Sequence, residues 1–271
     1  MVGTYISAAL ICAASLLVGR SLLALLGYER WTWLEPAVGL AALFTVAGFF
    51  ARAPGHATTA AIFVLVLLVA AAFATRLPYS YGAAAREGWP VLVAVFVVLA
   101  IPFAINARFG LIGVGFNNDL GLHLQWAEWL KNGLGPAPDR GYPLGPHALC
   151  TTISVLPGIG LDEAFMGLVI AIPAVTGLTA LAVLRDLAPG RRILGAVLVA
   201  LPYLAVSYFA QSAFKETAEA LFALAFAIAL PAAWPIPAAL KRPSSARAPS
   251  RAGITPMTSR ELIPTPMAPA A

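Results

Sequence analysis

The chain has 271 residues, of which 60% are hydrophobic and only 11% are charged, and its mean hydropathy is positive. Soluble domains carry about 25% charged residues, so this composition excludes them and predicts a polytopic membrane protein. The net charge of +5 lies mostly in the C-terminal tail and predicted inner loops. It therefore favours contact with anionic membrane lipids, and no nucleic-acid-binding signature accompanies it. Two cysteines are too few for a disulfide framework or a cysteine metal cluster.

Apolar runs near the ~20 residues that cross ~30 Å of hydrocarbon recur along the chain and predict an all-α bundle of about seven transmembrane helices. Charges, Pro or Gly bound each run. The seven predicted spans are Tyr5–Gly19, Trp33–Phe50, Ala57–Thr75, Trp89–Ile105, Phe165–Leu184, Ile193–Phe209 and Ala218–Trp234. A cleaved signal peptide is the alternative for the first run, but Met1 to Thr4 contain no basic residue. Apolar character resumes after Arg20, which favours a longer first helix or an interfacial one.

The distribution of Lys and Arg predicts the orientation, because short cytoplasmic loops keep positive charge. With the N-terminus outside, 12 of the 17 basic residues fall inside. Five fall outside, namely Arg52, Arg108, Lys131, Arg140 and Lys215. This count requires Pro146–Leu156 to be a helix that does not cross the membrane, for which it is too short. We therefore expect a multi-pass protein of the plasma membrane with an extracytoplasmic loop at 106–163 and a cytoplasmic C-terminal tail.

Three regions follow from this pattern. Residues 1–88 hold the N-terminal transmembrane helices, and residues 89–236 hold a transmembrane core that includes the long outer loop. Residues 237–271 are rich in Pro, Ala, Ser, Thr and Arg, a composition that buries too little apolar surface to order itself. We expect this tail to be disordered.

The outer loop holds the most informative polar residues of the chain. Asn118 and Asp119 open a short amphipathic stretch in which Asp119 is suited to cap a helix that Gly133 ends. Its apolar stripe comprises Leu122, Trp126, Trp129 and Leu130, so we expect the helix to lie on the membrane surface. His123 follows Asp119 by four residues and projects from the same side of the helix.

A rigid turn at 141–147 follows, with the sequence Gly-Tyr-Pro-Leu-Gly-Pro-His. Pro146 suits the first position of a second short surface helix, which would carry His147. The structural alternative is that Asp119 only caps a helix and that His147 only bonds nearby backbone.

A second polar cluster, Lys215, Glu216 and Glu219, is predicted on the same outer face as Asp119. Charges at a helix end near the membrane are costly, so Lys215 is a candidate to hold a lipid phosphate and Glu216 a candidate acid, base or metal ligand. An ion pair between Lys215 and Glu219, spaced i and i+4, is an equally weighted alternative.

These loop motifs resemble the first outer loop of polytopic GT-C-type glycosyltransferases, and the resemblance covers about Trp89 to Trp234. In that superfamily the loop carries two membrane-surface helices, and an acidic residue near the first one is catalytic. Asp119 matches that position. The resemblance implies transfer of a sugar from a polyprenyl-phosphate-linked donor to an acceptor at the extracytoplasmic face, with Asp119 as the general base or as a carboxylate that orients the acceptor.

The same resemblance implies which other residues would meet the substrate. A carboxylate would remove the proton of the acceptor hydroxyl while cations stabilise the leaving phosphate. Lys215 or Arg108 would be the phosphate partner, and His123, His147 and Glu216 are further candidate substrate-binding residues. Imidazole and carboxylate donors together also suit Mn²⁺ or Zn²⁺, and carboxylates alone suit Mg²⁺.

Alternatives from other classes remain open. Members of that superfamily usually have more spans and often a C-terminal soluble domain, so the chain would correspond to an N-terminal fragment whose activity needs a missing half or a partner. A transporter or flippase component would line a path with ionisable groups, but the predicted spans hold few of them near their centres. A structural membrane subunit needs no site at all.

Overall fold

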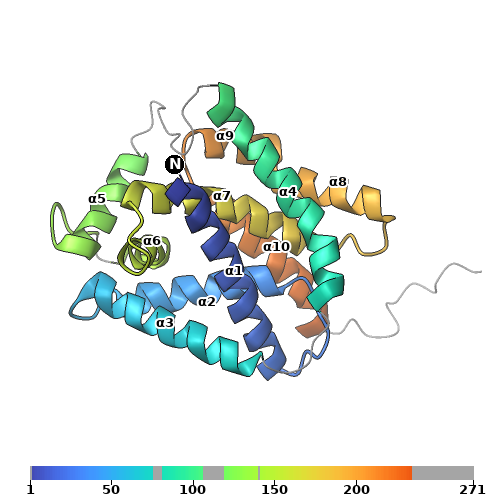
Figure 1. The fold of residues 1–271 in the computed structure, drawn as a ribbon, viewed down its shortest axis with the longest axis horizontal. Coiled ribbons are helices and arrows are strands. Elements are labelled where there is room, and N and C mark those ends of the chain that lie inside the picture. Colours follow the sequence, from blue (N-terminus) through green and yellow to red (C-terminus); the bar gives the residue numbers. More distant parts are fainter. Residues whose placement is uncertain (1, 76–80, 106–118, 140, 234–271) are drawn as a thin grey trace, which may run out of the picture. The chain divides into compact units, whose positions relative to one another are not determined.

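The computed structural model describes residues 2–75, 81–105, 119–139 and 141–233. These residues form α-helices and no β-strand, which confirms the all-α prediction (Figure 1). In chain order the helices are α1 (Val2–Leu25), α2 (Glu35–Phe50), α3 (His56–Ala74), α4 (Tyr81–Ile105), α5 (Asp119–Asn132), α6 (Gly145–Val155), α7 (Leu161–Ala180), α8 (Pro189–Ala200), α9 (Tyr203–Ala210) and α10 (Lys215–Ala233).

Four of these helices are long and apolar enough to cross a membrane, among the residues that the structure describes. They are α1, α3, α7 and the Gly82–Ile105 part of α4. Large apolar side chains are exposed on α3 and α4, among them Val66, Phe73, Val97 and Ile101. Such surfaces suit contact with membrane lipid rather than with water. The count of seven spans predicted from the sequence is not confirmed.

Helix α7 is the centre of the bundle. Every residue from Ala164 to Ala180 is buried, and α1, α4, α6 and α8 all pack against this helix (Figure 1). A helix that is apolar on all sides belongs in such a position, because no face of it needs contact with water. Pro173 lies inside α7 without ending it.

Glycines set the closest approach between helices. A Cβ added at Gly39 in α2 would overlap the carbonyl oxygen of Ser15 in α1, and one added at Gly19 would overlap that of Glu35. The backbones of α1 and α2 therefore touch where they cross, as small residues allow in membrane helices. In the same way, a Cβ at Gly145 would lie 2.7 Å from the carbonyl oxygen of Phe44, so α6 begins directly against α2.

The predicted sixth span, Ile193–Phe209, is two helices in the structure. Helix α8 ends at Ala200 and α9, of 8 residues, begins at Tyr203. Pro202 lies between them with extended backbone, at φ −64° and ψ 159°. Proline lacks an N–H and disfavours helical backbone in the residue before it, so the apolar run breaks here although its composition is continuous.

Helix α1 continues past Gly19 to Leu25, which is the longer first helix that the sequence offered as one alternative. This extension buries Arg20, whose guanidinium lies 3.5 Å from the Glu35 carboxylate and donates to the carbonyl oxygens of Tyr28, Glu29 and Arg30. A buried ion pair is tolerated only when further hydrogen bonds replace the lost hydration, and these carbonyls supply them.

Helix α6 differs from the expected surface helix. Gly145, His147 and every residue from Ala148 to Ser154 are buried, and the helix packs against α2, α3, α5 and α7. Its apolar and hydroxyl side chains alternate around the whole circumference, which suits a helix enclosed by others. Helix α5 is amphipathic as predicted.

Three segments meet at one end of the bundle. Arg52, just after α2, donates from Nη2 to the carbonyl oxygen of Tyr142 at 3.2 Å. The His56 ring at the start of α3 lies 4.7 Å from the Trp129 ring of α5, between centroids. The α9–α10 turn reaches the same place through Phe214 and His147. Residues of α5 and α6, the α2–α3 turn and the α9–α10 turn are thus neighbours.

Candidate functional site

His123 lies on the buried face of α5. That face consists of Leu120, His123, Trp126, Ala127 and Leu130, each at most 9% exposed. The sequence predicted a stripe through Leu122 instead, but Leu122 is 40% exposed. The buried face is rotated because α5 packs against α6, and an imidazole of α6 gives His123 a polar partner there.

That partner is His147. Its Nε2 lies 2.9 Å from Nδ1 of His123, so one ring donates a hydrogen bond and the other accepts it. The two side chains are 2% and 0% exposed. The sequence predicted both as substrate-binding residues; in the structure they hold α5 against α6 and are enclosed by protein.

Aromatic side chains surround this pair, and we call the assembly the histidine cluster. It joins α5, the turn before α6, α7 and the segment before α10, through His123, Trp126, Tyr142, His147, Phe165 and Phe214. The Phe214 ring lies 4.9 Å from the His123 ring, and the Trp126 ring lies 4.4 Å from the Tyr142 ring. These rings exclude water from the imidazoles and fix the start of α10 relative to α5.

The environment holds His147 neutral. The pKa of His147 is lowered from 6.5 to about 3, chiefly by burial and to a smaller extent by the nearby His123 and the Lys215 ammonium. His147 is therefore uncharged at neutral pH, and it shares a hydrogen bond with His123.

A cavity of about 540 Å³ lies directly beside the histidine cluster, and we call it the α2–α10 cavity. Tyr142 and Phe214 belong to both. Its lining residues are Phe44, Thr45, Gly48, Phe49, Arg52, Tyr142, Pro143, Leu144, Gly145, Pro146, Phe214, Lys215, Ala218, Glu219 and Phe222. The edge-to-face contact between Phe44 and Phe222, 6.1 Å between centroids, joins α2 to α10.

Two cations and one carboxylate line this otherwise apolar cavity. Arg52 comes from the α2–α3 turn, while Lys215 and Glu219 come from the first turns of α10. Arg52 is exposed and Lys215 is half-buried, so each side chain can reach a ligand without leaving water entirely. Guanidinium and ammonium groups are the side chains that bind phosphate oxygens best.

The other predicted site residues have different positions. Asp119 is the first residue of α5, one turn before His123, and its side chain lies outside the described residues, as does all of Arg108. Glu216 is half-buried, and its Oε2 accepts no hydrogen bond within the described part of the chain. Lys215 and His147 are brought together, and Lys215 also lines the α2–α10 cavity.

Sequence reasoning did not single out Arg52 or the phenylalanines of α2 as site residues. The charge count assigned both Arg52 and Lys215 to the outer face. That shared face was the available signal that the two cations could line one site. The position of Phe44 and Phe49 beside the turn at 141–146 depends on the glycine contacts between α2 and α6, which no local pattern reveals.

No group of three His, Cys, Asp or Glu residues that suits a metal ion occurs among the described residues. Within the histidine pair, the hydrogen bond occupies the ring nitrogens that face one another, so a metal cannot bridge them. No protein-family model, curated protein or solved structure matches the chain.

Proposed function

We propose that the protein transfers a sugar from a polyprenyl-phosphate-linked donor to an acceptor at the extracytoplasmic face of the plasma membrane. The observation that carries this proposal is the α2–α10 cavity, in which Arg52 and Lys215 share an apolar, aromatic-walled space. A lipid-linked phosphate matches these two features, because it has an anionic head and a hydrocarbon chain. Neither a soluble sugar nor a simple ion needs both.

In the proposed reaction the acceptor hydroxyl oxygen attacks the anomeric carbon of the sugar. The bond from that carbon to the phosphate oxygen breaks, and the lipid phosphate leaves with the bonding electrons. Arg52 and Lys215 stabilise the charge that develops on the phosphate. Asp119 accepts the proton of the acceptor hydroxyl, which is a role that a carboxylate fills at neutral pH.

The histidine cluster supports this function by position. Asp119 begins α5, and α5 is fixed to α6 by the His123–His147 hydrogen bond one turn later. The same cluster borders the cavity through Tyr142 and Phe214. We therefore assign His123 and His147 as positioning residues that hold the proposed base near the cavity.

A transfer assay tests the proposal. Membranes that contain the full chain are given a polyprenyl-phosphate donor with a radiolabelled sugar, and label in the acceptor fraction is measured. We expect Asp119→Asn to lower transfer by about two to four orders of magnitude, the usual contribution of a general base. Asp139→Asn, an exposed aspartate of the same loop, is the matched control and should leave transfer unchanged.

Two outcomes would contradict the proposal. Equal transfer by wild type and Asp119→Asn would remove Asp119 from the mechanism. Absence of transfer by the wild-type chain, together with movement of a labelled solute across the membrane, would favour the transporter alternative.

A further inference from the structure

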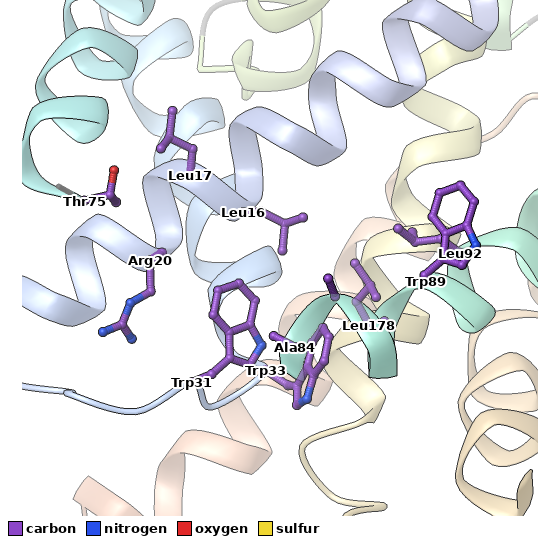
Figure 2. A pocket seen from close by; sticks show the side chains of 12 residues that line it. Leu16, Leu17, Arg20, Trp31, Trp33, Thr75, Ala84, Trp89, Leu92 and Leu178 are labelled. Atoms are coloured by element: carbon purple, nitrogen blue, oxygen red, sulfur yellow. The ribbon is translucent and has the colours of Figure 1, made fainter. Parts of the chain in front are cut away.

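A second cavity, of about 510 Å³, lies beside the start of α2 and the end of α3, away from the α2–α3 turn that adjoins the α2–α10 cavity. Figure 2 shows the residues that line it. Residues of α1, the α1–α2 connection, α3, α4 and α7 line it. They are Leu16, Leu17, Arg20, Trp31, Trp33, Thr75, Ala84, Ala85, Gly88, Trp89, Leu92 and Leu178. Its walls are almost wholly apolar. Arg20 is the one charged residue in the lining, and its charge is paired with that of Glu35.

This cavity continues along the groove between α1 and α4. A neighbouring cavity of about 380 Å³ shares Leu16, Trp89 and Leu92 with it and extends to Ala9 and Phe96. Along α4 the combined lining runs from Ala84 to Phe96, or about 18 Å at 1.5 Å per residue. This length is close to one leaflet, since a bilayer core is about 30 Å thick.

Tryptophans line the part of the groove that the 510 Å³ cavity forms. Trp31 and Trp33 meet edge to face at 5.5 Å between centroids, and Trp89 on α4 is 67% exposed. Figure 2 shows all three rings around the same space, with Arg20 and Thr75 beside it. Tryptophan is enriched where hydrocarbon meets lipid headgroups, so this end of the groove suits the depth of a headgroup.

Positive charge lies next to that end. Arg86 is exposed on α4, directly beside Ala85 of the cavity wall, and Arg30 is exposed beside the Arg20 contact. Of the carboxylates nearby, Glu35 pairs with Arg20, and Glu87 lies 3.1 Å from Arg192. Glu29 is exposed and offsets one of the arginines.

We propose that this groove, which we call the α1–α4 groove, binds one acyl chain of an anionic phospholipid from the leaflet at its own end. The chain lies along Leu16, Trp89 and Leu92, and the phosphate lies near Arg86. The apolar walls, the length of one leaflet, the tryptophans and the exposed arginine each match one part of such a lipid. This site is separate from the α2–α10 cavity and does not depend on the proposed transfer.

Native mass spectrometry of the delipidated full chain tests this proposal with two added lipids, phosphatidylglycerol and phosphatidylcholine of the same acyl chains. We expect one phosphatidylglycerol to be retained in preference to phosphatidylcholine. Arg86→Gln should reduce that preference roughly fivefold, the effect of one basic residue near an anionic surface. Ala85→Phe, which fills the mouth of the groove from an exposed position, should abolish retention of the tightly held lipid.

Ala83→Phe is the matched control, because Ala83 is exposed on the same helix and does not line the cavity. Phosphatidylglycerol with brominated acyl chains should quench the tryptophan fluorescence of the wild type more than that of Trp89→Phe. Equal lipid retention by Ala85→Phe and Ala83→Phe would overturn the proposal, as would equal binding of the two lipids by the wild type.

Discussion

The histidine pair shows how burial defines the chemistry of a residue. The His123–His147 hydrogen bond joins α5 to α6, and burial keeps His147 neutral. The sequence placed both residues on two loop helices, yet it could not show that they touch. Their contact depends on the rotation of α5 and on α6 being buried, which are tertiary properties.

The low pKa of His147 predicts a pH-dependent stability. The unfolded chain binds a proton near pH 6.5 and the folded chain only near pH 3, so stability is lost as the pH falls through this window. Between pH 6.5 and pH 5 the free energy of unfolding should fall by about 2 kcal/mol from this residue. Thermal unfolding in detergent at a series of pH values measures it.

His147→Phe provides the control for that measurement, because it keeps an aromatic ring in the histidine cluster and removes the titrating group. We expect the variant to show a flatter dependence of Tm on pH over the same interval. An unchanged slope in His147→Phe would mean that other groups cause the acid sensitivity.

At the scale of the elements, the sequence predicted which segments form helices but not how those helices pack. Gly133 and Pro146 predicted where α5 ends and where α6 begins, because both act through local backbone geometry. Pro202 carried the signal that the sixth apolar run is broken, but Pro90, Pro102 and Pro173 lie within intact helices. Tertiary contacts decide which prolines end a helix.

The glycine contacts between α1 and α2 predict a position that tolerates no side chain. Gly39→Leu should lower the Tm strongly, because a Cβ there meets the backbone of Ser15 and forces the two helices apart. The expected cost is about 3 kcal/mol or more, at the upper end for overpacking, since backbone cannot move aside as a side chain can. Gly82→Ala, where nothing lies within 4 Å of an added Cβ, should not destabilise the protein. Equal Tm values for the two variants would contradict the close crossing.

At the scale of the whole molecule, the basic residues fall into two groups, one at each end of the bundle. Arg52, Lys131 and Lys215 lie at the end with the histidine cluster, while Arg30 and Arg86 lie at the end with the α1–α4 groove. The sequence predicted this separation from loop counts alone, since loop charge requires no knowledge of packing. It also predicted the membrane class, because composition is sufficient for that.

Labelling of single cysteines tests the orientation. A membrane-impermeant maleimide added to intact cells should modify Leu134→Cys, which is exposed after α5, and should not modify Leu26→Cys, which is exposed after α1. The native Cys12 and Cys150 are buried and should contribute little background. The reverse pattern would place the α2–α10 cavity on the cytoplasmic face.

Affinity for a polyprenyl monophosphate tests the central claim most directly, namely that the α2–α10 cavity recognises a phosphate on a hydrocarbon chain. We expect wild type to bind this lipid, and Arg52→Gln and Lys215→Gln each to weaken binding by about tenfold or more, because each removes a charge-assisted hydrogen bond. Arg86→Gln, which alters a cation at the other end, should bind like wild type. Equal affinity in all four proteins would contradict the account.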